Sequence, residues 1–213
     1  MDTNEPHVRL HEIAVTADPC WPQWKAIYDA AFDECERFPD SFYLEMLDNK
    51  SRGEATNVSL LVAECIEQPG VVVAMADLVW LPVVRAVLLR YFATKEGLRG
   101  RGIGRSFYSG ILARCRTMGA DLMIFEVEIP EIMAARSEVE GDMARRRIQW
   151  YLRQGARLLA GIHYDLVMPG IPAMEMRLMA HTLGKLTAHD VFDAAKAVFG
   201  DALEQTGEVG LEN

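Results

Sequence analysis

Arg99-Gly100-Arg101-Gly102-Ile103-Gly104 is the stretch of this chain that decides its fold. It follows an apolar run, Val83 to Ala93, that we expect to be a strand, and it precedes Arg105 to Met118, whose apolar residues have helical spacing. Glycines in such a loop let the backbone approach a ligand closely, and the first N–H groups of a helix attract anions. The stretch therefore predicts a pyrophosphate-binding loop, to which Arg99, Arg101 and Arg105 add positive charge.

The spacing of the glycines disfavours two common nucleotide loops. A Walker A loop needs Gly-Lys-Ser or Gly-Lys-Thr, which the chain lacks. A dinucleotide fingerprint needs a third glycine three residues after its second, where this chain has Arg105 or Phe107. The phosphate ligand is therefore expected to be neither a P-loop nucleotide nor a dinucleotide.

The loop and its flanks resemble the GNAT superfamily of N-acyltransferases. Arg99, Gly102 and Gly104 fill the acyl-CoA loop pattern of that family, which is Arg or Gln, two residues, Gly, any residue, then Gly or Ala. Residues 91–98 stand where the family has a strand and a short turn, with Thr94 and Glu96 in place of the usual valine and proline. Residues 146–156 resemble the second signature, with Ala156 in place of the usual phenylalanine. The resemblance covers roughly residues 57–180.

The resemblance implies an α/β fold of the α+β kind, built on a mixed sheet. In the family the sheet is mostly antiparallel, one parallel strand pair splays around the acyl-CoA loop, and helices cover both faces. A chain of 213 residues, half of them hydrophobic, can bury one sizeable core, so we expect a single domain over 1–213 with its core at about 8–182. A helix over 187–206 is expected as a C-terminal addition, because Thr187 to Asp190 forms a capping box.

Apolar periodicity places the other elements along the chain. Strands are expected where apolar residues alternate or run together, and helices where they recur every three or four residues. The expected strands are 8–15, 58–66, 71–80, 122–128, 157–167 and 173–181. One helix is expected from about Asp18 to Phe32 and another from about Pro39 to Asn49. A further helix is expected before the last strand pair and ends near Gly155.

Charge and cysteine content limit the partners. A net charge of −9 argues against nucleic acid and anionic membranes, even with Arg145 to Arg147, and fits a cationic amine substrate. The four cysteines are scattered without a C-x-x-C pair or a nearby histidine grouping, so we expect no disulfide framework, no zinc site and no other metal. The N-terminus lacks a secretory pattern and no long apolar run occurs, so a cytoplasmic location is expected, and a homodimer is compatible with these features.

The resemblance implies acetyl-CoA as acyl donor and a small primary amine as acceptor. The backbone N–H groups around the end of the strand would hold the thioester carbonyl and the pantetheine arm. The amides and side chains of the loop would hold the pyrophosphate. The residues expected to bind acetyl-CoA are therefore Phe92, Ala93, Thr94, Arg99, Gly100, Arg101, Gly102, Ile103, Gly104 and Arg105.

Three side chains are candidates for proton transfer. Tyr151 lies four residues before Gly155, where the family places a general acid; its alternative is a core aromatic beside Ile148 and Leu152. Glu126 and Glu128 are two apart on one strand and so share a face, where either could act as base, directly or through a water, or bind the cationic substrate. A solvated strand end is the alternative for both glutamates. A non-catalytic acyl-CoA-binding module of the same fold would need neither Tyr151 nor Glu126.

Overall fold

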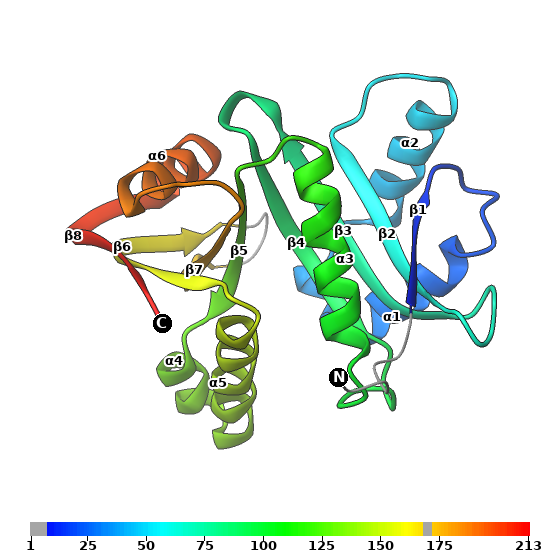
Figure 1. Cartoon of the computed structure of the whole chain (residues 1–213). Helices are drawn as coiled ribbons and strands as arrows, with labels where there is room; N and C mark the ends of the chain where they lie inside the picture. The colour runs from blue at the N-terminus through cyan, green and yellow to red at the C-terminus, as the bar shows by residue number, and fades with distance from the viewer. Residues whose placement is uncertain (1–7, 168–171) are drawn as a thin grey trace, which may run out of the picture. The chain divides into compact units, whose positions relative to one another are not determined.

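The computed structural model describes residues 8–167 and 172–213, and these form a mixed sheet with helices on both faces (Figure 1). The eight strands follow the order β1-β2-β3-β4-β5-β7-β6-β8, in which only β4 and β5 are parallel among the described pairs. The strands are β1 (Val8–Ile13), β2 (Val58–Cys65), β3 (Val72–Leu81), β4 (Ala86–Thr94), β5 (Leu122–Glu128), β6 (Arg157–Leu166), β7 (Met174–Thr182) and β8 (Leu203–Glu212). The α-helices are α1 (Trp21–Ala31), α2 (Asp40–Ser51), α3 (Ile103–Thr117), α4 (Pro130–Arg136), α5 (Glu138–Arg153) and α6 (Ala188–Phe199).

The chain packs as two compact units, and β4 contributes to both. The first unit contains the chain up to Leu81 together with Leu89–Thr117; the second contains Pro82–Leu88 and the chain from Met118 onward. Parallel pairing of β4 with β5 lies within the second unit, where Ala86–Leu88 matches Leu122–Ile124. The single-domain organisation stays a prediction.

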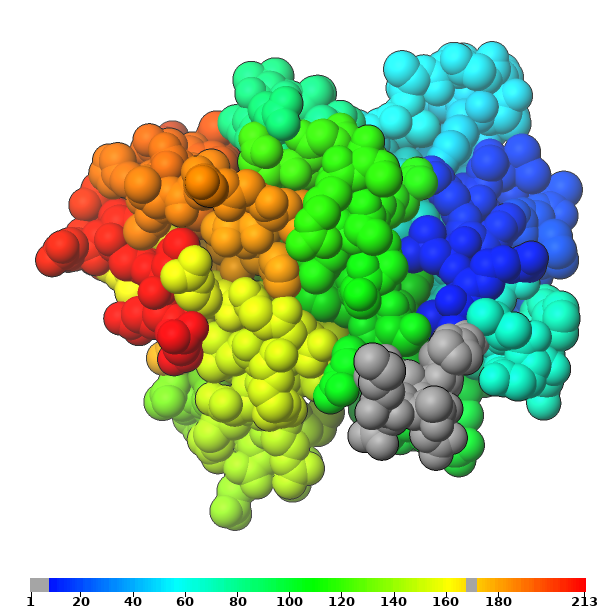
Figure 2. Space-filling view, viewed as in Figure 1, coloured from blue at the N-terminus to red at the C-terminus, as the bar shows by residue number. Residues whose placement is uncertain are grey.

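In the first unit, α1 and α3 cover opposite faces of the strands. Successive residues of a strand point to opposite faces. Tyr91 of β4 meets Tyr28 of α1, with ring centroids 4.8 Å apart, whereas Phe92 stacks on Phe107 of α3 at 5.7 Å. Figure 1 shows α3 across the near side of these strands, and Figure 2 shows its outer side at the surface.

A charged network lies inside the core of the first unit. Asp77 of β3 is fully buried, and its two carboxylate oxygens accept hydrogen bonds from Nη2 of Arg90 at 2.9 and 2.8 Å. The Tyr43 hydroxyl donates a third bond at 3.0 Å, and the Phe38 and Phe42 rings lie against the guanidinium. Burial raises the pKa of Asp77, and Arg90 and Tyr43 oppose that shift by stabilising the carboxylate.

In the second unit, α5 and α6 lie on opposite faces of β5. Phe125 faces α5, where its ring lies 4.3 Å from that of Tyr151. Its neighbour Ile124 belongs to an apolar cluster that includes Val191 and Phe192 of α6. The capping box expected at the start of α6 is present: Thr187 Oγ1 accepts the Asp190 N–H, and the Asp190 carboxylate accepts the Thr187 N–H at 2.7 Å. The fold class expected from the resemblance is confirmed.

The prediction of a helix over 187–206 is wrong beyond Phe199. Gly200 has φ 58°, a backbone conformation that ends a helix, and residues 203–212 instead form β8. Strand β8 pairs antiparallel with β6, and a bulge at Gly161 separates the two halves of that pairing. Tertiary pairing thus decides the conformation of a segment whose own sequence has little apolar alternation.

Three smaller differences concern element boundaries. The first strand ends at Ile13 rather than Val15. Residues 82–84 form a 3-10 turn, so β4 starts at Ala86, after Arg85 with φ 48°. The segment between β5 and the helix that ends near Gly155 contains α4, which starts at Pro130; proline is favoured at the first position of a helix.

Candidate active site

The glycine loop of the first unit connects the end of β4 to the start of α3. Thr94 is the last residue of β4, and Ile103 is the first of α3. Gly100 and Gly102 have φ 78° and 83°, a region that residues with a Cβ avoid. The backbone conformation of the loop therefore explains why glycine occupies these two positions. The Ser106 N–H bonds the Gly102 carbonyl at 3.1 Å, which closes the first turn of the helix on the loop.

The loop has the features of an anion site. The N–H groups of Ile103 and Gly104 lie in the first turn of α3, where a helix supplies no internal acceptor. Arg99, Arg101 and Arg105 are exposed along the same stretch. A Cβ placed at Gly100 would meet no atom within 4 Å, so the backbone there is open to a ligand. These residues fit a pyrophosphate group, as the sequence predicts.

A cavity of about 320 Å³ adjoins this loop within the first unit. It brings together Thr94 and Arg99 from the expected acetyl-CoA set, with Lys95 and Glu96 between them in sequence. Its other wall is one side of α1 and the start of β3, formed by Gln23, Ala26, Ile27, Ala30, Ala31 and Val72. The Lys95 N–H bonds the Val73 carbonyl at 2.9 Å, which fixes the chain where it leaves β4.

Phe92 and Ala93 are directed into the protein. The Phe92 ring packs on Phe107 and, at 6.0 Å, on Tyr108 of α3, and Ala93 is buried. The Ala93 side chain is therefore not available to a ligand, and the backbone groups of Phe92 and Ala93 keep the role that the resemblance implies for them.

Tyr151 lies on α5 in the second unit, and it is buried. Its ring packs on Phe125 and, at 5.0 Å, on Trp150. Burial raises the pKa of Tyr151; the charge of Arg147 lowers it, and that of Glu128 raises it further. The hydroxyl therefore keeps its proton at neutral pH, as a general acid requires. Packing and proton donation are compatible at this position, because the ring and the hydroxyl perform them separately.

Glu126 has a partner that lies far from it in sequence. The Tyr164 hydroxyl of β6 donates a hydrogen bond to Glu126 Oε1. Burial raises the pKa of Glu126, and the bond from Tyr164 opposes that shift. A carboxylate with a raised pKa is better suited to accept a proton near neutral pH than a solvated one.

Glu128, at the end of β5, forms an ion pair with Arg147 of α5. Arg147 belongs to the run Arg145 to Arg147, and it is the member of that run that contacts a candidate residue. Glu128 and Arg147 both act on Tyr151, so the structure brings these three side chains together in the second unit. Tyr164 and Arg147 are distant in sequence from the glutamates they contact, and no local motif marks them.

The family of this chain follows from comparison with known sequences. The model of the acetyltransferase (GNAT) family matches residues 21–136, just over half of the 213 residues. The chain belongs to the GNAT acetyltransferase family. The match includes the glycine loop, Glu126 and Glu128, and it ends before Tyr151. No curated protein matches the chain in sequence.

Solved structures share the fold. A GNAT-family protein from Bacteroides thetaiotaomicron has a TM-score of 0.67 at 21% identity, over 90% of this chain and 98% of that one. The spermidine/spermine N-acetyltransferase SpeG from Vibrio cholerae has a TM-score of 0.57 at 12% identity, over 92% and 96%. The protein yncA from Salmonella typhimurium, solved with its cofactor acetyl-CoA, has 0.56 at 16% identity, over 85% and 96%. Family and fold together support acyl transfer from an acyl-CoA as the general reaction.

Across residues 8–167 and 172–213, no helix has the length and apolar character needed to cross a membrane.

Proposed function

We propose that this protein is an N-acetyltransferase that moves the acetyl group of acetyl-CoA directly to the primary amine of a small cationic acceptor. The observation that carries the proposal is the glycine loop at the start of α3, with two glycines in the left-handed region and three exposed arginines, in a chain of the GNAT family.

The first unit supplies the binding of acetyl-CoA. Its pyrophosphate binds the N–H groups at the start of α3 and the arginines of Arg99 to Arg105. The backbone of Phe92 to Thr94 holds the pantetheine arm and the thioester carbonyl, whose oxygen gains negative charge during the reaction. The open backbone at Gly100 and the cavity beside Thr94 and Arg99 support these roles.

The proton transfers are assigned, on the family resemblance, to Tyr151 and to Glu126 or Glu128. The acceptor nitrogen must be neutral to attack the thioester carbon, so its ammonium form first loses a proton to a base. Glu128 is our first choice as base because it lies with Arg147 beside Tyr151; Glu126, which contacts Tyr164 on the α6 side of β5, or an intervening water is the alternative. As the C–N bond forms and the C–S bond breaks, the Tyr151 hydroxyl gives its proton to the departing thiolate, and the proton that the new amide nitrogen loses restores the hydroxyl.

The charge of the protein supports a cationic acceptor. The net charge is −9, and the exposed residues around the start of α4 and α5 include Glu131, Glu138 and Glu140. One structural neighbour acts on spermidine and spermine, so polyamines belong among the first acceptors to test.

The test is release of the CoA thiol from acetyl-CoA in the presence of a panel of primary amines, with tertiary amines as matched controls. We expect thiol release that depends on a primary amine and a product of the mass of the acetylated amine. Saturable acetyl-CoA binding with no turnover on any amine would contradict the proposal and favour a non-catalytic acyl-CoA-binding module.

A further inference from the structure

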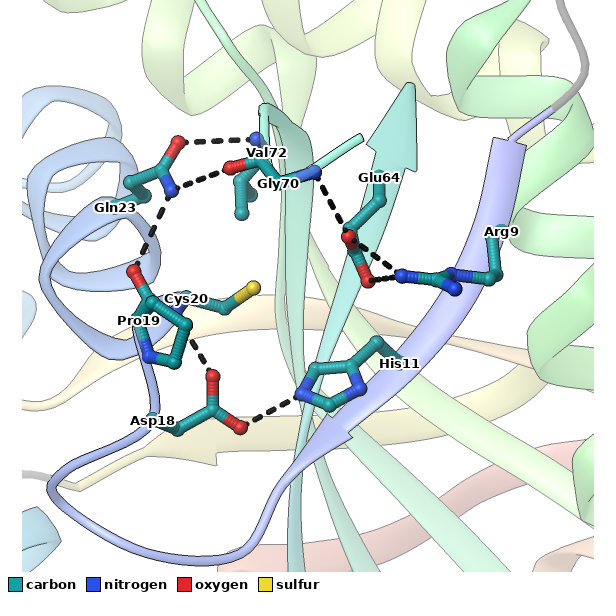
Figure 3. A network of polar contacts seen from close by, with 9 residues as sticks. All are labelled: Arg9, His11, Asp18, Pro19, Cys20, Gln23, Glu64, Gly70 and Val72. Atoms are coloured by element: carbon teal, nitrogen blue, oxygen red, sulfur yellow. Dashed lines mark hydrogen bonds and ion pairs between the residues drawn. The ribbon is translucent and has the colours of Figure 1, made fainter. Parts of the chain in front are cut away.

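A cluster of three side chains with nitrogen, oxygen and sulfur donors lies away from the glycine loop, in the first unit (Figure 3). His11 comes from β1, Asp18 from the turn that follows it, and Cys20 from the position just before α1. His11 Nε2 lies 2.7 Å from Asp18 Oδ2, and one ligand atom from each residue lies within 4.8 Å of the other two. None of the three belongs to the expected acetyl-CoA set or to the proton-transfer residues.

The carboxylate of Asp18 is held in a fixed orientation. Its Oδ1 accepts the Cys20 N–H at 2.8 Å, which leaves Oδ2 directed at His11. The turn itself is closed by a bond from the Asp18 N–H to the Val15 carbonyl at 3.2 Å. A ligand oriented by a second hydrogen bond is typical of metal sites, where outer contacts fix the donor atoms.

Burial differs across the cluster. The side chains of His11 and Asp18 are 36% and 12% exposed, and Cys20 is 4% exposed. A cation could therefore reach the cluster from the His11 side and meet the thiol at its buried end. Figure 3 shows the Cys20 sulfur directed to the side of the turn on which His11 and Glu64 lie.

We propose that His11, Asp18 and Cys20 form a binding site for a divalent transition-metal ion of the Zn²⁺ class, with a water as the fourth ligand. Imidazole nitrogen, carboxylate oxygen and thiolate are the three donor types that Zn²⁺ takes in proteins. Tetrahedral coordination at ordinary bond lengths places such donors roughly 3.3–3.6 Å apart. Donors within 4.8 Å of one another reach that spacing through small side-chain rotations.

The charges balance on binding. Cys20 supplies the thiol donor of the cluster. The S–H proton leaves to solvent as the sulfur–metal bond forms, and one carboxylate and one thiolate then neutralise the divalent ion. The Cys20 side chain makes no capping bond to α1.

Glu64 is not a fourth ligand, because its carboxylate is already engaged. Both oxygens accept bonds from Arg9, at 3.0 and 2.9 Å, and Oε2 also accepts the Gly70 N–H at 3.2 Å. The Arg9–Glu64 pair is neutral overall and closes one side of the site (Figure 3).

A metal at this position would join β1 to the start of α1. Gln23, in the first turn of α1, already bonds the Gly70 carbonyl at 2.8 Å and the Val72 N–H at 3.0 Å, and it lines the cavity beside Thr94 and Arg99. Metal binding therefore stabilises the helix that forms one wall of that cavity. The effect is on the stability of the folded chain, and it does not depend on the proposed reaction.

The experiment uses full-length protein freed of metal with a chelator and titrated with Co²⁺ as a spectroscopic probe. We expect one Co²⁺ per chain, a thiolate-to-cobalt charge-transfer band, displacement of Co²⁺ by Zn²⁺, and a higher melting temperature with Zn²⁺. Cys20→Ser should abolish the band, and His11→Gln should weaken Zn²⁺ binding by at least about tenfold. Cys35→Ser, which removes an exposed cysteine, is the matched control and should keep the band.

Two results would overturn the proposal: no charge-transfer band with the wild-type protein, or a band that Cys20→Ser leaves intact. Melting curves recorded in chelator show whether each variant is folded. If Cys20→Ser does not fold, His11→Gln carries the test, because His11 lies at the exposed end of the cluster. Acetyl-CoA binding measured on the same samples separates failure of this site from failure of the proposed function.

Discussion

Removal of the Asp77 carboxylate should destabilise the protein strongly. In Asp77→Ala the guanidinium of Arg90, whose side chain is 14% exposed, loses its only described ion-pair partner, and the Tyr43 hydroxyl loses its acceptor. The aromatic rings of Phe38 and Phe42 lie against the guanidinium but cannot neutralise it. Breaking a buried pair on one side costs about 3–5 kcal/mol in the free energy of unfolding.

The assay is thermal unfolding followed by near-ultraviolet circular dichroism. For a chain of this size the loss corresponds to a fall in Tm of roughly 6–20 °C. The double variant Asp77→Leu/Arg90→Met removes both charges and should melt higher than Asp77→Ala, because no unpaired charge is left in the core. The exposed pair of Asp48 and Arg52 provides the control, and Asp48→Ala should change Tm little. A Tm for Asp77→Ala within about 2 °C of wild type would refute the buried pair.

Three further variants test other parts of the structure. Tyr151→Phe keeps the ring contact with Phe125 but removes the hydroxyl, so kcat should fall by roughly 100-fold while the Kd of acetyl-CoA stays the same; full activity would leave Tyr151 a packing role only. The pKa of Glu126 in the folded state lies above the ordinary 4.5, so the folded state holds this proton more tightly than the unfolded state does. The stability that the bound proton contributes is present below pH 4.5 and is lost as the pH rises through the folded pKa. Glu126→Gln should therefore melt higher than wild type at pH 8 and equally at low pH, and an equal Tm at both pH values would contradict the raised pKa. Gly161→Ala places a Cβ 2.2 Å from the Glu208 carbonyl oxygen and should disrupt the β6–β8 pairing. The control Gly53→Ala, with φ 77° and no atom within 4 Å of the new Cβ, should cost only the backbone strain of about 1–2 kcal/mol. Equal Tm values for the two variants would argue against the pairing of β8 with β6.

Local sequence was sufficient to predict the strand, glycine loop and helix that form the candidate cofactor site. Each of these three elements is determined by residues close together in sequence: the apolar pattern of the strand, the spacing of the glycines and the apolar pattern of the helix. The family resemblance rests on the same residues. The capping box at Thr187 and Asp190 was predictable for the same reason, since its two bonds join residues three apart.

Long-range contacts were not predictable in this way. Tyr164 meets Glu126 across 38 positions of sequence, and β8 exists because β6 offers it an edge for pairing. Local propensity predicted that the last helix extends to residue 206, whereas residues 203–212 form β8 because they pair with β6. The cluster of His11, Asp18 and Cys20 was also missed, because its donors match no spaced motif and meet only through the turn between β1 and α1.

Titration of wild type and Gly102→Trp with acetyl-CoA in a calorimeter tests most directly whether the glycine loop binds the cofactor. Gly102 has φ 83° and Gly53 has φ 77°, so Gly53→Trp is a control with matched backbone strain outside the loop. We predict saturable binding of one acetyl-CoA per chain by wild type and Gly53→Trp. Binding by Gly102→Trp should be at least about tenfold weaker, a loss of roughly 1.4 kcal/mol or more. An unchanged Kd for Gly102→Trp, or no binding by wild type, would contradict the assignment of the loop.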